Sequence, residues 1–289
     1  MKKIALVILI IALILTCGIV LSACNNATTQ GQLANLLTDH NQETFVYDVL
    51  NKFDNTQGTY TVILQAYDKG ESVSDFGNAT LENVDDGVFV SGSLAIGDKT
   101  YRTGCYFNLI SGSSFMVPAY TFRVEKNGEV ETFRLQGSYD GATLNYERYI
   151  NGEKSTGSVK ASGTYYDNNE FQQSLRTVTT FSTSFNFGFT MPLVSAKEST
   201  KINLTASCSA TQDITVPYHT EAISCYRVNL SRSTEVNGVA QQLYYATDNL
   251  TYNGWNMKNV LVKFIEHYKD DESGNIYDIE YNLKEASLA

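Results

Sequence analysis

Residues 120–152 read YTFRVEKNGEVETFRLQGSYDGATLNYERYING, and this stretch decides the fold class of the chain. It contains three runs rich in Tyr, Phe, Val and Thr, namely Tyr120–Glu125, Glu131–Ser138 and Thr143–Ile150. β-Branched and aromatic residues favour strands. An Asn-Gly or Asp-Gly pair follows each run, and such pairs accept the positive φ angles that tight hairpins require. The stretch therefore predicts neighbouring strands that are joined by short turns.

The same pattern continues over most of the chain on both sides of this stretch. The other predicted strands are Thr59–Tyr67, Gly87–Ile96, Thr100–Asn108, Ser158–Tyr166, Lys201–Ala210, Glu221–Leu230, Val239–Thr247, Met257–Tyr268 and Ile276–Asn282, and the alternating run Phe181–Phe189 fits a further strand. Parallel neighbours need long crossover connections, and the spacing of these runs leaves little room for them. We therefore expect one large, curved antiparallel meander. Two β-rich lobes divided near residues 192–200 are the alternative arrangement.

Two segments differ from the strand pattern and predict helices. In Asp39–Phe53, apolar side chains recur four residues apart at Phe45, at Val49 and at the last residue, which is the spacing of an amphipathic helix. A second helix is predicted over about Asn168–Thr180, with Asp167 as its capping residue. The expected fold class is therefore α+β and mainly antiparallel β, with a large curved meander sheet, an N-terminal helix and a mid-chain helix.

The first 24 residues predict export and a lipid anchor. Two basic residues precede the unbroken apolar run Ile4–Leu15, and Leu21-Ser22-Ala23-Cys24 follows it. A basic start, an apolar centre and small residues at the cleavage point are typical of a secretory signal. The Leu-Ser-Ala-Cys sequence resembles the lipobox of bacterial lipoproteins. An uncleaved membrane-spanning helix is the alternative, because about 20 apolar residues can cross a bilayer.

The lipoprotein resemblance implies that the chain has three parts. Residues 1–23 are then a signal peptide, residues 24–38 a lipidated tether and residues 39–289 a β-rich globular domain. The thiol of Cys24 receives a covalent diacylglyceryl group, and no other cofactor is expected. Two buried acyl chains hold a protein to a bilayer far better than one. The protein is therefore expected at the cell membrane, on its extracytoplasmic face.

The charge balance limits the partners that the protein can bind. The chain has 21 Lys and Arg against 31 Asp and Glu, a net charge of −10, and loss of Lys2 and Lys3 with the leader leaves −12. Such a surface repels phosphate backbones, so nucleic-acid binding is not expected. It also repels anionic lipid headgroups. The lipid anchor, rather than electrostatic attraction, is therefore expected to hold the protein at the membrane.

The sequence contains no arrangement of residues that predicts catalysis. The 3 His have no His or Cys neighbour at ligand spacing, so no metal site is expected. Gly-x-Ser-x-Gly, Ser-x-x-Lys and the dinucleotide-binding glycine fingerprint are all missing. We therefore expect a protein that is not an enzyme. Cys105, Cys208 and Cys225 remain in the mature chain, and buried thiols are favoured over a cross-strand bridge between the last two.

Aromatic residues are the remaining candidates for a binding site. The chain contains 19 Tyr, 14 Phe and 1 Trp, and most of them are expected to pack a sheet face. The residues that we predict to contact an apolar ligand are Phe181, Phe185, Phe187, Phe189 and Trp255. The order of elements resembles that of half-barrel lipid-carrier proteins of bacterial envelopes. That family places a helix before a long antiparallel meander and covers the concave face with helices, which implies a lipid or another apolar ligand.

These observations favour a cell-surface, lipid-anchored protein that binds an apolar or amphipathic ligand without catalysis. The alternative is a structural or interaction module that docks another envelope protein through an exposed strand edge or sheet face. An enzyme is the third possibility, and it would need a cleft with convergent polar groups.

Overall fold

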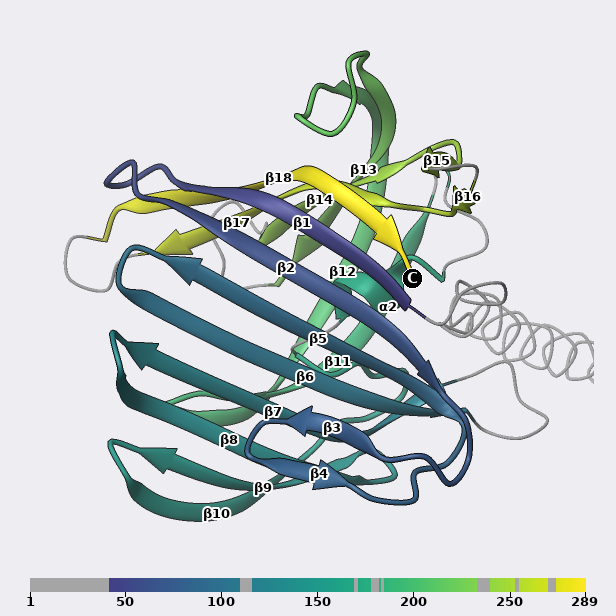
Figure 1. The fold of residues 1–289 in the computed structure, drawn as a ribbon. Coiled ribbons are helices and arrows are strands. Elements are labelled where there is room, and N and C mark those ends of the chain that lie inside the picture. The colour runs from purple at the N-terminus through teal and green to yellow at the C-terminus, as the bar shows by residue number, and fades with distance from the viewer. Residues whose placement is uncertain are drawn as a thin grey trace, which may run out of the picture.

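The computed structural model describes residues 42–109, 116–168, 171–177, 182, 185–232, 240–252, 255–269 and 274–289. Strands account for 71% of the described residues, and they form one large antiparallel sheet and two small hairpins (Figure 1). The expectation of a mainly antiparallel β fold with a large curved sheet is therefore confirmed. The signal peptide 1–23, the tether 24–38 and Cys24 itself lie outside the described residues.

The large sheet contains 14 strands. In chain order these are β1 (Gln42–Asn51), β2 (Gln57–Tyr67), β5 (Gly87–Ile96), β6 (Lys99–Leu109), β7 (Met116–Asn127), β8 (Val130–Asp140), β9 (Thr143–Ile150), β10 (Glu153–Lys160), β11 (Asn186–Val194), β12 (Ser199–Ile214), β13 (Ile223–Ser231), β14 (Gln241–Ala246), β17 (Leu261–Lys269) and β18 (Ile276–Leu288). Their order across the sheet is β10-β9-β8-β7-β6-β5-β2-β1-β18-β17-β14-β13-β12-β11. The small hairpins are β3 (Val73–Phe76) with β4 (Ala79–Leu81), and β15 (Leu250–Tyr252) with β16 (Trp255–Met257). Strands β11 and β12, which flank residues 195–198, pair with each other in the large sheet.

The turns of the meander form where the Asn-Gly and Asp-Gly pairs predict them. Gly128 and Gly141 have φ angles of 58° and 53° in the turns that join β7, β8 and β9. Asn151 and Gly152 have φ angles of 50° and 85° between β9 and β10. Residues other than Gly, Asn and Asp rarely adopt positive φ, so these pairs fix where the strands end.

The N-terminal helix predicted over Asp39–Phe53 is wrong, because residues 42–51 form the central strand β1. Side chains alternate along this strand, and Phe45, Tyr47 and Val49 are buried on its inner face. A spacing of four residues is also two strand repeats, so the pattern that predicts the helix fits a strand equally well. Strand β1 pairs with β2 on one side and with β18, from the other end of the chain, on the other.

The strand predicted over Met257–Tyr268 is divided in the structure into β16 and β17. Asn259 adopts a φ angle of 46°, which interrupts the extended backbone. The carbonyl oxygens of Lys258 and Asn259 then accept hydrogen bonds from Arg176, and Asn259 Nδ2 donates to the backbone oxygen of Arg176 over 2.7 Å. The break therefore provides acceptors for the mid-chain segment.

The sheet curves until its two edges lie close to each other (Figure 1). The chain that follows β10 hydrogen-bonds to the edge strand β11, from Tyr166 N to Thr190 O (3.1 Å) and from Thr190 N to Thr164 O (2.9 Å). Arg148 Nη1 of β9 donates across the gap to Ser195 O over 2.9 Å. The result is a nearly closed, curved sheet with a protected interior.

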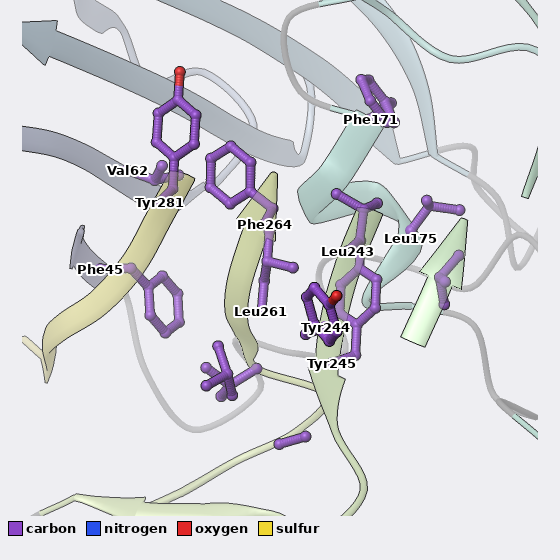
Figure 2. Packing of buried hydrophobic residues seen from close by; sticks show 14 of the residues in the cluster. Phe45, Val62, Phe171, Leu175, Leu243, Tyr244, Tyr245, Leu261, Phe264 and Tyr281 are labelled. Carbon is purple, nitrogen blue, oxygen red and sulfur yellow. The ribbon is translucent and has the colours of Figure 1, made fainter. Parts of the chain in front are cut away.

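The mid-chain helix lies inside this curve. A helix forms where Asn168–Thr180 predicts one, but its described part, α2 (Phe171–Leu175), is shorter. Residues 169–170 and 178–180 lie outside the described residues. Phe171 and Leu175 belong to the interior apolar cluster, together with Phe264 and Tyr281 (Figure 2). The helix therefore packs against the inner face of the sheet.

The hairpin of β3 and β4 covers part of the outer face of the sheet. Phe76 contacts Phe89 and Phe122 with ring-centroid distances of 6.1 and 5.0 Å. Gly104 lies beneath this contact, where a Cβ atom would come within 2.2 Å of the Phe122 ring. This outer apolar cluster is separate from the interior one.

Candidate functional site

A buried ion pair fixes the segment around α2 inside the sheet. Arg176, the residue after the helix, is fully buried, and its Nη1 donates to Glu43 Oε2 of β1 over 2.8 Å. The guanidinium also donates to the carbonyl oxygens of Lys258 (3.0 Å) and Asn259 (3.3 Å). Its Cζ atom lies 4.7 Å from the ring centre of Phe45. Because a buried charge needs a counter-ion and hydrogen-bond partners, these contacts position the segment against β1.

A buried carboxylate fixes the start of the same segment. Asp167 accepts from Tyr139 Oη (2.5 Å) and from Thr121 Oγ1 (3.1 Å). Burial, and next the Asp167 carboxylate, raise the pKa of Tyr139 well above its ordinary value, so the phenol keeps its proton and donates. Tyr245 Oη donates to the backbone oxygen of Gln172 in α2 over 2.8 Å. The segment is therefore held by β7 and β8 at its start and by β14 at the helix.

An inner cavity of about 350 Å³ lies between α2 and the walls of the sheet. Strands β2, β5, β6 and β7 contribute one part of its lining, and β14, β17 and β18 contribute another. The apolar and aromatic lining residues are Tyr60, Leu94, Tyr101, Phe171, Leu193, Phe264 and Tyr281. The rings of Phe264 and Tyr281 stack with centroids 3.9 Å apart, and Figure 2 shows them side by side. This cavity therefore presents aromatic rings to whatever occupies it.

A second cavity, of about 550 Å³, lies beside the inner one, and Tyr101 lines both. It lies where the β1–β2, β5–β6 and β17–β18 turns come together, and we name it the mouth. Phe53 and Tyr268 line it and are 59% and 56% exposed. The rings of Phe53 and Tyr277 are in contact, with centroids 4.0 Å apart. The mouth is therefore a solvent-facing aromatic site that adjoins the inner cavity.

Part of the inner cavity is polar. Glu266 Oε1 accepts from Gln241 Nε2 (3.1 Å), and Glu266 Oε2 accepts from Tyr281 Oη (3.0 Å). Burial raises the pKa of Glu266, while the hydrogen bond from Tyr281 acts in the opposite direction. Burial raises the pKa of Tyr281 well above its ordinary value, so the phenol remains the donor. Arg123, the cation of the cavity lining, forms an ion pair with Glu125.

Two buried atoms in this polar part have no hydrogen-bond partner among the described residues. They are the hydroxyl Oγ1 of Thr103 and the amide oxygen Oε1 of Gln241. The Thr103 hydroxyl and the Tyr60 phenol pack closely over Gly92, where a Cβ atom would lie 2.6 Å from Thr103 Oγ1 and 2.9 Å from Tyr60 Oη. The arrangement of aromatic rings around a few polar groups is suited to binding an amphipathic molecule.

Three of the residues predicted to contact a ligand come together at the start of β11, with Phe185 directly before the strand and Phe187 and Phe189 on it. Phe185, Phe187 and Phe189 are all buried in the interior cluster. The rings of Phe187 and Phe189 stack with centroids 5.7 Å apart, and Tyr166 meets Phe189 edge-on at 5.2 Å. These rings pack against one another as core, and their contact with a ligand stays a prediction.

The other two predicted residues are placed differently. Phe181 lies outside the described residues. Trp255 begins β16, where it pairs with Tyr252 in the small hairpin. The structure therefore does not bring Trp255 into β11 with the phenylalanines, and its contact with a ligand also stays a prediction.

The sequence does not single out the residues that line the two cavities. Tyr60, Tyr101, Phe264 and Tyr281 all lie in stretches that are predicted as strands. Alternation shows which neighbours share a face with each of them, but it does not show which face becomes concave. The only available signal is the abundance of Tyr and Phe in these strands.

The cysteines that the structure describes are buried. Cys105, Cys208 and Cys225 form no disulfide with one another. Cys208 lies opposite Val228 on the neighbouring strand, whereas Cys225 lies opposite Gln212, so the two thiols are out of register for a cross-strand bridge. The interpretation as buried thiols is confirmed.

Among the described residues, no group of three or more His, Cys, Asp and Glu side chains could hold a metal ion. None of the helices in the described ranges is long and apolar enough to cross a membrane. Comparison of the chain with protein-family models, with curated proteins and with solved structures gives no match. The function must therefore be inferred from the residues of this chain.

Proposed function

We propose that this protein is an exported, lipid-anchored protein that binds an apolar or amphipathic ligand inside its curved sheet without catalysing a reaction. The observation that carries the proposal is the pair of adjoining cavities, of about 350 and 550 Å³, that share Tyr101. Small-molecule sites are clefts of about 300–1,000 Å³ with mostly apolar and aromatic walls and a few placed polar groups. Both cavities fall in that size range, and each combines aromatic rings with polar side chains.

The packing of the interior supports this function. Protein interiors normally leave few voids larger than a water molecule. In this protein, the region around Phe187 and Leu243 is filled by buried side chains. The region around Tyr60 and Phe264, in the same sheet, leaves a cavity. A filled core beside an open cavity favours binding over a purely structural role.

The mouth and the N-terminal end of the described domain lie at opposite ends of β1. The described chain begins at Gln42, and the mouth residues Asn51 and Phe53 lie at the other end of this ten-residue strand. Ten residues of strand span about 33 Å. A tether from a lipidated Cys24 would enter the domain away from the mouth, so the anchor would leave ligand exchange unobstructed.

A variant that fills the inner cavity tests the proposal. Leu94→Trp places an indole in the cavity lining, whereas Ala95→Trp places the same side chain on the exposed outer face of β5. Both are made in the full chain carrying Cys24→Ser, which removes the thiol that would carry the lipid. We expect organic extracts of the parent chain and of Ala95→Trp to contain a co-purifying apolar compound by mass spectrometry, and extracts of Leu94→Trp to lack it.

Binding of the neutral apolar dye N-phenyl-1-naphthylamine provides the second measurement. We expect the parent chain and Ala95→Trp to bind the dye and Leu94→Trp to bind it at least tenfold more weakly, with similar melting temperatures for all three. If neither a co-purifying compound nor dye binding is found in the parent chain, the proposed function is wrong.

Docking of another envelope protein through a sheet edge is the second candidate function from the sequence. Edge strand β10 carries the exposed residues Lys154 and Lys160, and exposed lysines on an edge discourage the addition of a further strand. The other edge strand, β11, already hydrogen-bonds at Thr190 to the chain that follows β10. Both edges therefore favour ligand binding over strand addition.

A further inference from the structure

The unpartnered atoms of the inner cavity indicate which polar group a ligand carries. Thr103 Oγ1 and Gln241 Oε1 are buried, line the same cavity and have no hydrogen-bond partner among the described residues. A buried polar atom without a partner destabilises the fold, and such atoms in native proteins have a ligand, a water or a strained role as their explanation. Two of them in one cavity, beside aromatic rings, point to a ligand.

The hydrogen bonds around Gln241 determine what its free atom requires. Gln241 Nε2 donates to Glu266 Oε1 over 3.1 Å, so the amide nitrogen faces the carboxylate and the amide oxygen is left without a donor. An amide oxygen only accepts. The group that meets it must therefore carry an O–H or N–H bond. A ligand ether or carboxylate has no hydrogen to offer this atom.

The charges of the cavity argue against an anionic ligand. Each carboxylate oxygen of Glu266 already accepts a hydrogen bond, one from Gln241 and the other from Tyr281. A ligand carboxylate next to Glu266 would be repelled by it. Arg123 could attract an anion, but it is paired with Glu125. The hydroxyl of Thr103 can donate or accept. A neutral hydroxyl group suits either free atom, since it can donate to Gln241 Oε1 or accept from the Thr103 hydroxyl.

The apolar end of such a ligand has one continuous path. Tyr101 lines both cavities, and the exposed rings of Phe53 and Tyr268 line the mouth beyond it. We infer that the cavity takes a neutral, hydroxyl-bearing amphiphile, with its hydroxyl end against Thr103 and Gln241 and its apolar part along Tyr101 toward the mouth. This inference rests on the proposed function and specifies the chemical class of its ligand.

Three compounds with the same chain length test the inference. Dodecan-1-ol carries a hydroxyl donor, 1-methoxydodecane replaces it with an acceptor-only ether, and dodecanoate is anionic at pH 7. Each is used to displace N-phenyl-1-naphthylamine from the full chain carrying Cys24→Ser. A site that hydrogen-bonds a hydroxyl rejects an analogue without it. We expect dodecan-1-ol to bind about tenfold or more tightly than the ether, and dodecanoate to bind more weakly than dodecan-1-ol.

Thr103→Val is the matched variant, because valine keeps the β-branched shape and removes only the hydroxyl. The hydroxyl of Thr103 has no hydrogen-bond partner among the described residues, so the variant should be at least as stable as the parent. We expect its affinity for dodecan-1-ol to fall about tenfold and its affinity for the ether to stay the same. Thr59→Val, on the exposed outer face of β2, should change neither affinity.

The outcomes separate the inference from the proposed function. Equal binding of the alcohol and the ether, tighter binding of dodecanoate, or an unchanged alcohol preference in Thr103→Val overturns the inference and leaves ligand binding intact. If the dye binds and none of the three compounds displaces it, the inference also fails. If neither the dye nor any of the compounds binds, both are overturned.

Discussion

Replacement of Arg176 by methionine tests how α2 is held inside the sheet. The guanidinium is fully buried, donates to Glu43 over 2.8 Å and supplies donors to the carbonyl oxygens of Lys258 and Asn259. Methionine is unbranched and fills irregular apolar space well. The variant therefore removes the charge and the donors while it keeps much of the packing against Phe45.

The expected loss of stability is large. Removal of one partner of a buried ion pair costs about 3–5 kcal/mol, because the other charge stays buried without a counter-ion. In Arg176→Met the charge left without a partner is Glu43. The carbonyl oxygens of Lys258 and Asn259 also lose their donor, and each costs a further ~1–3 kcal/mol if no water replaces it. We expect a loss of at least about 5 kcal/mol, the lower end of this sum, which equals the whole stability of a marginal domain. If this variant does not fold, Glu43→Gln provides a milder change that keeps an acceptor for Arg176.

Urea unfolding of the Cys24→Ser chain, followed by circular dichroism, measures the loss. At a slope of roughly 2.5 kcal/mol per molar urea, 5 kcal/mol lowers the midpoint by about 2 M. Lys154→Met is the matched control, because Lys154 and Glu147 form an ion pair of similar length, 2.6 Å, with side chains 48% and 44% exposed. Exposed pairs contribute little, so its midpoint should stay unchanged.

The double variant Glu43→Leu with Arg176→Met tests whether the two buried charges stabilise the fold as a pair. It leaves neither charge alone in the interior, so it should be more stable than the sum of the two single losses predicts. Strict additivity of the two single changes would refute the role assigned to the pair. A midpoint shift in Arg176→Met as small as that in Lys154→Met would refute it as well.

Three further outcomes are expected. A thiol reagent at pH 8 should modify Cys105, Cys208 and Cys225 only after unfolding, because all three are buried and burial raises the pKa of Cys225 to about 12; rapid labelling of the native chain would contradict this. Burial raises the pKa of Glu266 above 4.5, so the folded protein binds this proton more tightly than the unfolded chain and loses stability as the pH rises through the folded-state pKa. The urea midpoint of Glu266→Gln should therefore change less between pH 4 and 7 than that of the parent chain. An equal change in the two proteins would contradict a raised pKa for Glu266. Cys24→Ser should abolish labelling by radioactive palmitate and release the protein from the membrane fraction, and an unlabelled parent chain would reject the lipobox assignment.

The meander could be predicted from the sequence because its signals are local. Asn151 and Gly152 are adjacent, and their positive φ angles belong to one turn that needs no distant partner. The same holds for Gly128 and Gly141 between their strands. By contrast, β1 pairs with β18 through residues such as Phe45 opposite Ala286, far apart in the chain. A local periodicity cannot report that contact, so the helix predicted there is wrong.

The candidate site could not be predicted from the sequence, for a related reason. Tyr60 and Thr59 alternate on β2, and the sequence does not show which of them faces the interior. That choice depends on how the sheet curves and on what lies inside it. The phenylalanines of β11 satisfy the same aromatic pattern as the cavity lining, yet Phe187 and Phe189 pack against each other. Composition therefore identifies aromatic strands but does not separate core from cavity.

The buried ion pair explains how one arrangement of sheet and helix is selected. Glu43 lies on the inner face of β1 in line with Phe45 and Tyr47, and Arg176 directly follows the buried helix α2. A shift of β1 by one residue would turn Glu43 to the outer face and leave the Arg176 guanidinium buried alone. Such a shift would cost several kcal/mol. The pair therefore fixes both the register of the central strand and the position of α2, and the inner cavity beside Phe171 depends on that position.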